Sequence, residues 1–338
     1  MSAEVQIGIR LPVYGVFPTD NPFDLIQDLA TTADRGGLDS IWVVDHFLMP
    51  DESIRAAGGE PARNAPLEAW TTLTAVASWT KNVKVGTEVT PMIRHHPSIL
   101  AKITSTLDVL SKGRVILGAG AGWFPVEFKS FGLPWYKIDD RFERMYEAIE
   151  IISKLWTEDV VDYGGKYYRL RGARLFPKPV QKPCPPIWFG GESDRILRAV
   201  VKYGDGWIPA NNTAPEKYEA LVKRLKVFAS EAGRDPSDIT MAGPFTAQIN
   251  RDYEEARRSV DEYGSRAAGE GVSTSWNVAF SASRLYGIWG TPEECIRRIE
   301  KYVRLGAQHF ILDLLPPTTS QTTVELLCDE IIPHIKHR

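Results

Sequence analysis

The segment that decides the fold is Val83–Gly118, with the sequence VKVGTEVTPMIRHHPSILAKITSTLDVLSKGRVILG. It opens with Val83–Val89, a short apolar run typical of a strand. Ser98–Ser111 has apolar residues at helical spacing, and Arg114–Gly118 is a second run of strand type. Two strands joined by a helix pair in parallel, because the helix carries the chain back along the sheet. The segment therefore predicts a βαβ unit.

The same alternation of strand and helix continues on both sides of this unit. Further strands are predicted at Val5–Leu11, Leu38–Asp45, Pro186–Gly190, Gly206–Pro209, Ile239–Ile249 and Ala307–Leu314. Further helices are predicted at Phe23–Arg35, Leu67–Lys81, Arg141–Leu155, Arg195–Tyr203, Glu216–Ala232 and Val324–Lys336. About eight strands in this order favour a closed (β/α)8 TIM barrel, an α/β fold, over an open doubly wound sheet.

Three segments depart from the repeat, and we expect them to be insertions in a single domain of residues 1–338. They lie at about residues 47–66, 157–185 and 264–289. The first is a loop containing Gly and Pro, and the second holds a predicted hairpin, Val160–Tyr163 with Lys166–Leu170, before a proline-rich stretch. The third is rich in small and polar residues, as a lid or an interface insertion would be. Long loops in a compact domain are usually functional or mobile.

The composition restricts the class of protein. The chain is 43% hydrophobic and 25% charged, which is an ordinary globular mixture. Its 40 Lys and Arg against 43 Asp and Glu give a net charge of −3, which argues against a nucleic-acid-binding protein. No apolar run is long enough for a membrane helix, and we expect no signal peptide. The cysteines Cys184, Cys295 and Cys328 are far apart, which predicts reduced thiols in a cytoplasmic protein.

In a (β/α)8 barrel, residues at the carboxyl ends of the strands line the active site. In this chain these residues are Asp45-His46, Thr90-Pro91, Gly118–Trp123, Gly190-Gly191-Glu192 and Ala210-Asn211-Asn212. Gly118–Gly122 has glycine at every second position, which allows a flat ligand to approach the backbone or simply makes a tight bend. Its spacing differs from that of the dinucleotide-binding fingerprint. Gly190-Gly191 opens a predicted helix, whose free N–H groups could hold a phosphate.

Individual side chains suggest acid–base chemistry rather than metal or Schiff-base chemistry. His46 is the candidate acid or base, because imidazole exchanges protons near neutral pH; the alternative is a hydrogen-bonded polar residue without a role. Glu127 could transfer protons or line a substrate pocket, although we favour an exposed helix carboxylate. Trp123 is expected against a ligand ring, and His95-His96 is expected to shape a loop. No His, Cys and carboxylate set has metal-ligand spacing, and no lysine ends a predicted strand, so no metal is predicted.

Short motifs spread along the chain resemble those of the bacterial luciferase-like monooxygenase superfamily. They are Trp42-Val43-Val44-Asp45-His46-Phe47, Arg94-His95-His96-Pro97, Leu110-Ser111-Lys112-Gly113-Arg114, Gly118–Trp123, Pro177–Pro183 with Pro185–Trp188, Gly190-Gly191, Gly204-Asp205-Gly206-Trp207 and Gly290-Thr291-Pro292-Glu293-Glu294. The resemblance runs from Gly8 to about Pro316 and implies an oxidoreductase with a (β/α)8 barrel.

The form of these motifs is more similar to the branch that uses the deazaflavin coenzyme F420 than to the branch that uses FMN. The resemblance implies F420 as the cofactor, with FMN as the alternative, and catalytic roles for His46 and Asp45 beside the ring. It implies cofactor contacts for Thr90, Ala119, Gly120, Ala121, Gly122, Gly190, Gly191, Glu192, Ala210 and Asn211. Trp123 and Glu127 are expected in the substrate pocket.

The resemblance implies hydride transfer between F420 and a small organic substrate. Relatives that oxidise a sugar phosphate carry a glutamate directly after the glycine run, where this chain has Trp123, so we do not expect a sugar phosphate. One alternative is an FMN-dependent monooxygenase that uses O2 and reduced flavin from a partner reductase. Another is a flavin-binding barrel without catalytic activity. The resemblance also implies a homodimer or a higher homo-oligomer.

Overall fold

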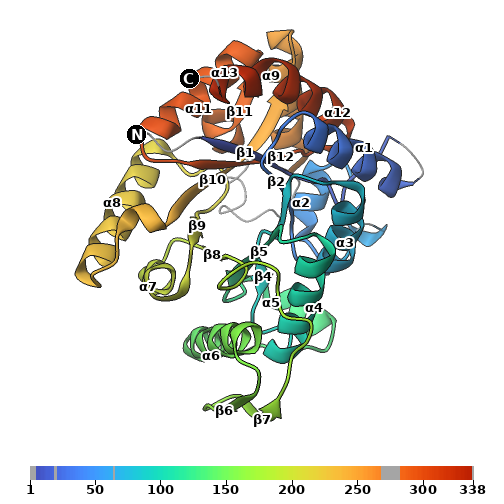
Figure 1. The fold of residues 1–338 in the computed structure, drawn as a ribbon. Helices are drawn as coiled ribbons and strands as arrows, with labels where there is room; N and C mark the ends of the chain where they lie inside the picture. Colours follow the sequence, from blue (N-terminus) through green and yellow to red (C-terminus); the bar gives the residue numbers. More distant parts are fainter. Residues whose placement is uncertain (1–4, 19–20, 64, 268–281, 337–338) are drawn as a thin grey trace.

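A computed structural model of the chain describes all residues except 1–4, 19–20, 64, 268–281 and 337–338. Within the described residues, eight parallel strands form a closed barrel surrounded by helices (Figure 1). This arrangement confirms the predicted (β/α)8 fold. The interpretation of residues 264–289 as a lid or interface insertion lies largely outside the described residues.

The barrel strands follow one another in chain order around the ring. They are β1 (Gln6–Arg10), β2 (Ser40–Val43), β3 (Lys84–Thr87), β5 (Val115–Gly120), β8 (Ile187–Gly190), β9 (Gly206–Ile208), β10 (Thr240–Ile249) and β12 (His309–Asp313). Strand β12 pairs with β1 and β9 pairs with β10, which closes the ring. Because every pairing in the ring is parallel, the carboxyl ends of all eight strands meet at one mouth.

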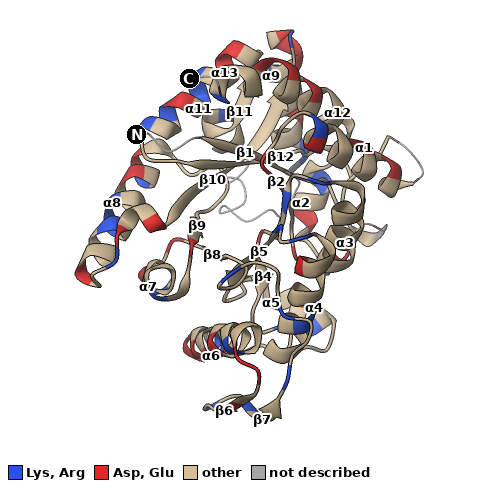
Figure 2. Cartoon of the chain, in the orientation of Figure 1, with Lys and Arg blue, Asp and Glu red and all other residues tan. Residues whose placement is uncertain are grey.

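Long helices connect and cover these strands. They are α1 (Pro22–Arg35), α3 (Ala69–Trp79), α4 (Pro97–Leu110), α6 (Ile138–Thr157), α7 (Asp194–Tyr203), α8 (Pro215–Glu231), α9 (Tyr253–Ala267), α11 (Pro292–Arg304) and α12 (Pro317–Leu326). Their starts follow from local sequence: Thr291 and Glu294 form a capping box at α11, with Pro292 at its first position. Charges of both signs lie along the outer helices (Figure 2).

The core has two layers. Inside the barrel lie Trp42, Ile116, Trp188, Ile208, Ala242 and Ile311, which form one buried cluster. The rings of Trp42 and Trp188 are 5.1 Å apart at their centroids, so two large side chains fill the middle of the barrel. A larger cluster of aliphatic and aromatic side chains lies between the strands and the helices. The barrel interior is therefore a packed core, as is usual for this fold.

Short elements were not predicted. They are α2 (Asp51–Ala56), α5 (Pro125–Ser130), β4 (Thr90–Pro91), β11 (Ile288–Gly290) and the 3-10 turns Pro61–Arg63 and Pro236–Asp238. The predicted helix Val324–Lys336 is present as the end of α12, the π turn Leu327–Ile331 and α13 (Ile332–Lys336). Strand β4 pairs with the end of β5, and β11 pairs with the end of β10, so both extend the wall at the mouth. The predicted hairpin of the second insertion is present as β6 (Val161–Gly164) and β7 (Arg169–Ala173). No helix in the described part of the chain has the length and apolar character of a membrane span.

Candidate active site

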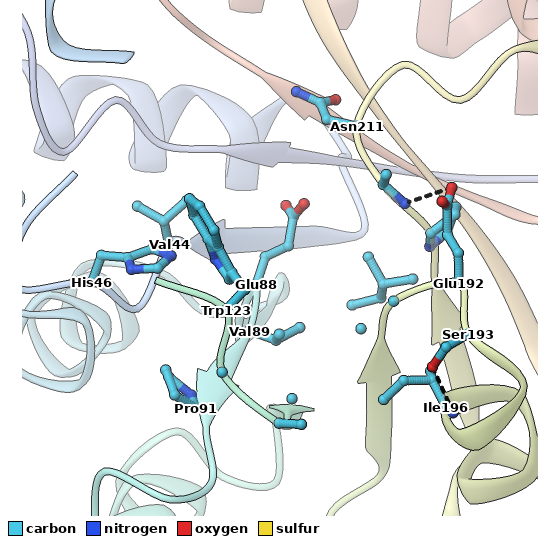
Figure 3. Close-up of a pocket in the computed structure, with 18 of the residues that line it drawn as sticks. Val44, His46, Glu88, Val89, Pro91, Trp123, Glu192, Ser193, Ile196 and Asn211 are labelled. Carbon is cyan, nitrogen blue, oxygen red and sulfur yellow. Dashed lines mark hydrogen bonds between the residues drawn. The ribbon is translucent and has the colours of Figure 1, made fainter. Parts of the chain in front are cut away.

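A cavity of about 1020 Å³ opens at the carboxyl ends of the barrel strands. The segments that follow β2, β5, β8 and β9 line it, as the sequence led us to expect (Figure 3). The predicted site residues that reach it are His46, Gly120, Ala121, Gly122, Trp123, Gly190, Gly191, Glu192, Ala210 and Asn211. Segments separated by more than a hundred residues therefore converge on one mouth.

Four predicted site residues do not line the cavity. Asp45, Thr90, Ala119 and Glu127 are fully buried behind its wall. The Asp45 carboxylate accepts a hydrogen bond from Thr90 Oγ1 at 2.6 Å and another from the Arg94 guanidinium. We had expected Asp45 to flank the cofactor ring, but both of its oxygens are committed to these partners. Its position is that of a support for the wall.

The position of Glu127 corrects the expectation of an exposed helix carboxylate. It lies on α5, is 0% exposed, and its Oε2 is 3.1 Å from His46 Nδ1. Its other oxygen accepts a hydrogen bond from the Phe47 N–H at 2.5 Å and lies 3.4 Å from Arg94 Nη1. The six-residue helix α5 thus presents Glu127 to the loop after β2. Glu127 contacts His46 instead of lining the substrate pocket.

Glu127 also orients the His46 ring. Burial alone would raise the pKa of Glu127, but the hydrogen bonds from His46 and Phe47 and the charge of Arg94 lower it below its ordinary value. An ionised Glu127 accepts a hydrogen bond from Nδ1–H of His46, which leaves Nε2 to exchange protons. The His46 ring meets Trp123 edge-on, with centroids 5.6 Å apart. Both rings line the cavity.

Val89 explains why glycine is needed at two strand ends. A Cβ on Gly120 or on Gly190 would lie 2.8 Å from Val89 Cγ2, closer than van der Waals contact allows. The absence of side chains there allows Val89 to rest against the backbone of β5 and β8 at the cavity wall (Figure 3). The glycine run was expected to admit a flat ligand; the group that approaches Gly120 is Val89 itself. The result is a smooth apolar platform inside the cavity.

The opposite end of the cavity is formed by the start of α7. Ser193 caps this helix by accepting a hydrogen bond from the Ile196 N–H at 3.4 Å. Gly191, expected to offer a free N–H, donates it to the Ile208 carbonyl at 2.9 Å. Glu192 accepts from Thr213 Oγ1 at 3.0 Å and pairs with Lys217. What remains for an anion at this end is the helix N-terminus itself and Arg195, which also lines the cavity.

The cavity wall also carries a group of charged residues that the motifs of the sequence do not predict. Arg10, Glu88 and Asp313 stand at the carboxyl ends of β1, β3 and β12, and all three line the cavity. Each of them falls inside a predicted strand, Val5–Leu11, Val83–Val89 or Ala307–Leu314. Their sequence context therefore predicts strand residues and not residues of the site. A charged residue close to the end of an otherwise apolar strand was the signal that could have found them.

The remaining histidine motif has a structural position. His96 caps α4 by accepting a hydrogen bond from the Ser98 N–H at 3.3 Å, in agreement with the expected loop role. Among the described residues, no group of three His, Cys, Asp or Glu side chains is arranged to hold a metal ion. The site is thus a mainly apolar cavity with one imidazole and a few carboxylates.

Taken together, an apolar cavity, a histidine oriented by a carboxylate and a helix N-terminus at the mouth of a (β/α)8 barrel define an enzyme that binds a large organic ligand. The family model for luciferase-like monooxygenases matches residues 10–309. The chain therefore belongs to the luciferase-like monooxygenase family, which confirms the resemblance of its motifs, and it is an enzyme.

Individual relatives are more specific. The chain is 31% identical to an F420-dependent glucose-6-phosphate dehydrogenase from Amycolatopsis mediterranei, over 86% of this chain and 88% of that protein. It is similar to the structure of an F420-dependent secondary alcohol dehydrogenase in complex with an F420–acetone adduct, with 25% identity, a TM-score of 0.79 and coverage of 98% and 99%. The F420-dependent tetrahydromethanopterin reductase of Methanopyrus kandleri shares the fold, with 24% identity, a TM-score of 0.78 and coverage of 99% and 100%.

Proposed function

We propose that this protein is an oxidoreductase that transfers hydride between coenzyme F420 and a small uncharged organic substrate. The observation that carries the proposal is the convergence of the Val89 platform, His46 and the α7 N-terminus on one cavity. Relatives whose names state F420 dependence support the choice of cofactor. When bound, F420 supplies a carbon atom that accepts or donates a hydride.

The described residues fit a planar deazaflavin. The cavity volume of about 1020 Å³ accommodates a large cofactor together with a small substrate. Val89, with the backbones of Gly120 and Gly190, offers a flat apolar surface for the ring. The N-terminus of α7 and Arg195 would hold the anionic tail, because unpaired N–H groups and the helix dipole favour negative charge.

Residues of this chain would contribute orientation and proton transfer. Binding two reactants in a fixed geometry contributes on the order of 7–11 kcal/mol at best. His46, held by Glu127 through Nδ1, would exchange a proton at Nε2, and such acid–base assistance contributes ~10²–10⁴-fold. Trp123, half exposed at the mouth, would cover the substrate.

The charges around the cavity favour an uncharged substrate. Among the described lining residues, the arginines are Arg10 and Arg195. Arg10 is bound by two carboxylates, and Arg195 is at the end assigned to the cofactor tail, where it pairs with Asp139 at 2.5 Å. A phosphate ester as substrate would need a further cation. By the resemblance, Trp123 also stands where sugar-phosphate relatives carry a glutamate.

Glucose 6-phosphate is a second candidate substrate, because it is the substrate named for several relatives that are about 30% identical. An FMN-dependent monooxygenase supplied by a partner reductase is a further alternative, which the family name supports. A flavin-binding barrel without turnover is the third. We also infer a homodimer or higher homo-oligomer, which sedimentation of the purified protein would test.

Equilibrium binding separates these candidates. Purified protein is titrated with F420 and, separately, with FMN, and the change in ligand fluorescence is followed. We expect saturable binding of F420 and much weaker binding of FMN. Preferential micromolar binding of FMN would overturn the choice of cofactor, and binding of F420 without turnover of any alcohol or carbonyl compound would favour the non-catalytic barrel.

A further inference from the structure

A charged cluster on the cavity wall has no part in the function proposed above. Arg10 Nη1 donates a hydrogen bond to Glu88 Oε1 at 3.0 Å, and Arg10 Nη2 donates to Asp313 Oδ2. The side chains of Arg10, Glu88 and Asp313 are 11%, 9% and 2% exposed, respectively. All three line the cavity, and Figure 3 shows the Glu88 carboxyl group pointing into it. One buried guanidinium therefore joins two carboxyl groups at the edge of the ligand space.

Neither the hydrogen bonds nor the charge balance of this cluster is complete. Glu88 Oε2 and Asp313 Oδ1 are buried, and neither has a hydrogen-bond partner among the described residues. One guanidinium carries one positive charge, so it cannot neutralise two carboxylates. Leaving a buried charge without a partner is costly, because the group has lost its contact with water. Either a proton on one carboxyl group or a donor group of a ligand would complete the cluster.

The surroundings of Glu88 identify which carboxyl group takes the proton. Burial raises the pKa of Glu88 to about 7, Arg10 opposes this rise, and the Asp313 carboxylate adds to it. The other titratable groups near this end of the cavity are Tyr14, on the segment after β1, Tyr263 on α9 and His46 after β2. The pKa values of both tyrosines are raised, first by burial, so they stay neutral near pH 7.

We propose that Glu88 is a second proton-exchanging residue of this site, which takes the proton of a substrate hydroxyl group on oxidation and returns it to the carbonyl oxygen on reduction. Arg10 and Asp313 act as positioning residues that hold Glu88 and determine its charge. This inference rests on the proposed function, since it assigns the substrate end of the same cavity.

The proposed step balances in atoms and electrons. On oxidation, the carbinol C–H bond breaks and its electron pair leaves as hydride to an acceptor of the deazaflavin class. The O–H bond breaks, its electron pair forms the C=O bond, and the proton passes to the Glu88 carboxyl group, which lines the cavity. His46, which lines the same cavity, would supply the proton that the reduced acceptor needs. Reduction of a carbonyl compound follows the same steps in reverse.

The charges of the cluster also indicate the class of substrate. A neutral hydroxyl group can donate a hydrogen bond to a carboxylate of this pair, and protonated Glu88 can donate one to a carbonyl oxygen; Glu88 Oε2 and Asp313 Oδ1 have no partners in the described residues. A phosphate or carboxylate at this place would be repelled by the Asp313 charge, since both negative charges of the pair share the single Arg10. The inferred substrate is therefore an uncharged alcohol or its carbonyl partner.

Infrared difference spectroscopy on the cofactor-free protein tests the inference without turnover. We expect a carboxylic-acid C=O band that disappears between about pH 6 and pH 8, with a midpoint near the Glu88 pKa of about 7. Glu88→Gln should remove this band. Asp313→Asn should move its midpoint to lower pH, because removing the neighbouring negative charge favours ionised Glu88. Glu192→Gln, which alters a cavity carboxylate paired with Lys217, is the matched control and should leave the band unchanged.

Measurements of kcat provide the second test of the inference. With F420 and a neutral secondary alcohol, Glu88→Gln should lower kcat by ~10²–10⁴-fold while the Kd for F420 stays within about twofold. Glu88→Asp, which keeps a carboxyl group, should recover part of the loss; circular dichroism checks that each variant is folded. The absence of a neutral-pH carboxyl band, its persistence in Glu88→Gln, or an unchanged kcat would overturn the inference. Failure to bind F420 would overturn the proposed function and leave the infrared result standing.

Discussion

The two ends of the barrel differ in whether their buried polar atoms have hydrogen-bond partners. At the amino end, His309 Nε2 lies 2.7 Å from Ser40 Oγ and His309 Nδ1 lies 2.9 Å from Gln6 Oε1. The indole N–H of Trp42 donates to the same Ser40 oxygen at 2.7 Å. At the carboxyl end, Glu88 Oε2 and Asp313 Oδ1 are buried without a partner in the described structure.

This difference separates polar groups that stabilise the fold from those that are available for chemistry. Burial, with repulsion from Lys84 and Lys336, lowers the pKa of His309 to about 3, so this imidazole is neutral and its hydrogen bonds are complete. The carboxyl-end cluster instead keeps unsatisfied acceptors in residues that line a cavity. Variants at the amino end should therefore change stability, and variants at the carboxyl end should change binding or rate.

Removal of the imidazole at the carboxyl end should have the largest effect. His46→Ala should fold and bind F420 but lose ~10²–10⁴-fold in kcat, equivalent to about 3–5 kcal/mol, because the proton-exchanging group is gone. Stopped-flow measurement of hydride transfer checks the rate, and fluorescence titration checks binding. Near-wild-type turnover would remove His46 from the mechanism.

Changing the partner of that imidazole should have a smaller effect. Glu127→Gln weakens a charged hydrogen bond to His46, worth about 1.5–3 kcal/mol, so kcat should fall by about 10–100-fold. Because the carboxylate holds the His46 ring in place, the loss should fall on kcat, and the Kd for F420 should change little. Glu127→Asp, which keeps a carboxylate, should restore part of the lost kcat. An unchanged kcat in Glu127→Gln would show that this contact does not position His46 for the reaction.

At the amino end, Ser40→Ala should alter stability alone. It leaves His309 Nε2 and Trp42 Nε1 without a partner, which costs about 1–3 kcal/mol of unfolding free energy. Denaturant unfolding measures this loss, and kcat of the folded variant should match that of the wild type. A tenfold loss of kcat at full folding would contradict the division between the two ends.

The smallest effect is expected at the platform. Gly190→Ala places a Cβ 2.8 Å from Val89 Cγ2, so Val89 must move into the cavity, and the affinity for F420 should fall by about tenfold. The double variant Gly190→Ala with Val89→Ala removes the collision and should recover part of the affinity. If Gly190→Ala binds F420 as tightly as the wild type, the platform does not contact the ring.

The sequence was sufficient for the barrel because each long strand and helix carries its own periodic pattern. The strands that form the ring lie within the predicted runs, except that β5 continues two residues further, to Gly120. Short elements escaped prediction, since two or three residues, as in β4 and β11, contain no period to recognise. Strand ends were misjudged by one or two residues, and that error concealed Arg10, Glu88 and Asp313.

The site residues divide in the same way. His46 comes shortly after β2 and Gly190 ends β8, so the topology alone places them at the mouth. Glu127 was misjudged because its partner His46 lies 81 positions away in the sequence, and no local pattern reveals a contact of that range. Asp45 was placed beside the ring, but it turns towards Arg94, which only the three-dimensional packing determines.

The central claim is that the protein catalyses hydride transfer between F420 and an uncharged substrate in this cavity. The most direct measurement is the decrease in absorbance of oxidised F420 when the protein is mixed, without oxygen, with neutral secondary alcohols or with glucose 6-phosphate. We predict reduction of F420 by one of the alcohols and none by glucose 6-phosphate. Reduction by glucose 6-phosphate alone would contradict the account.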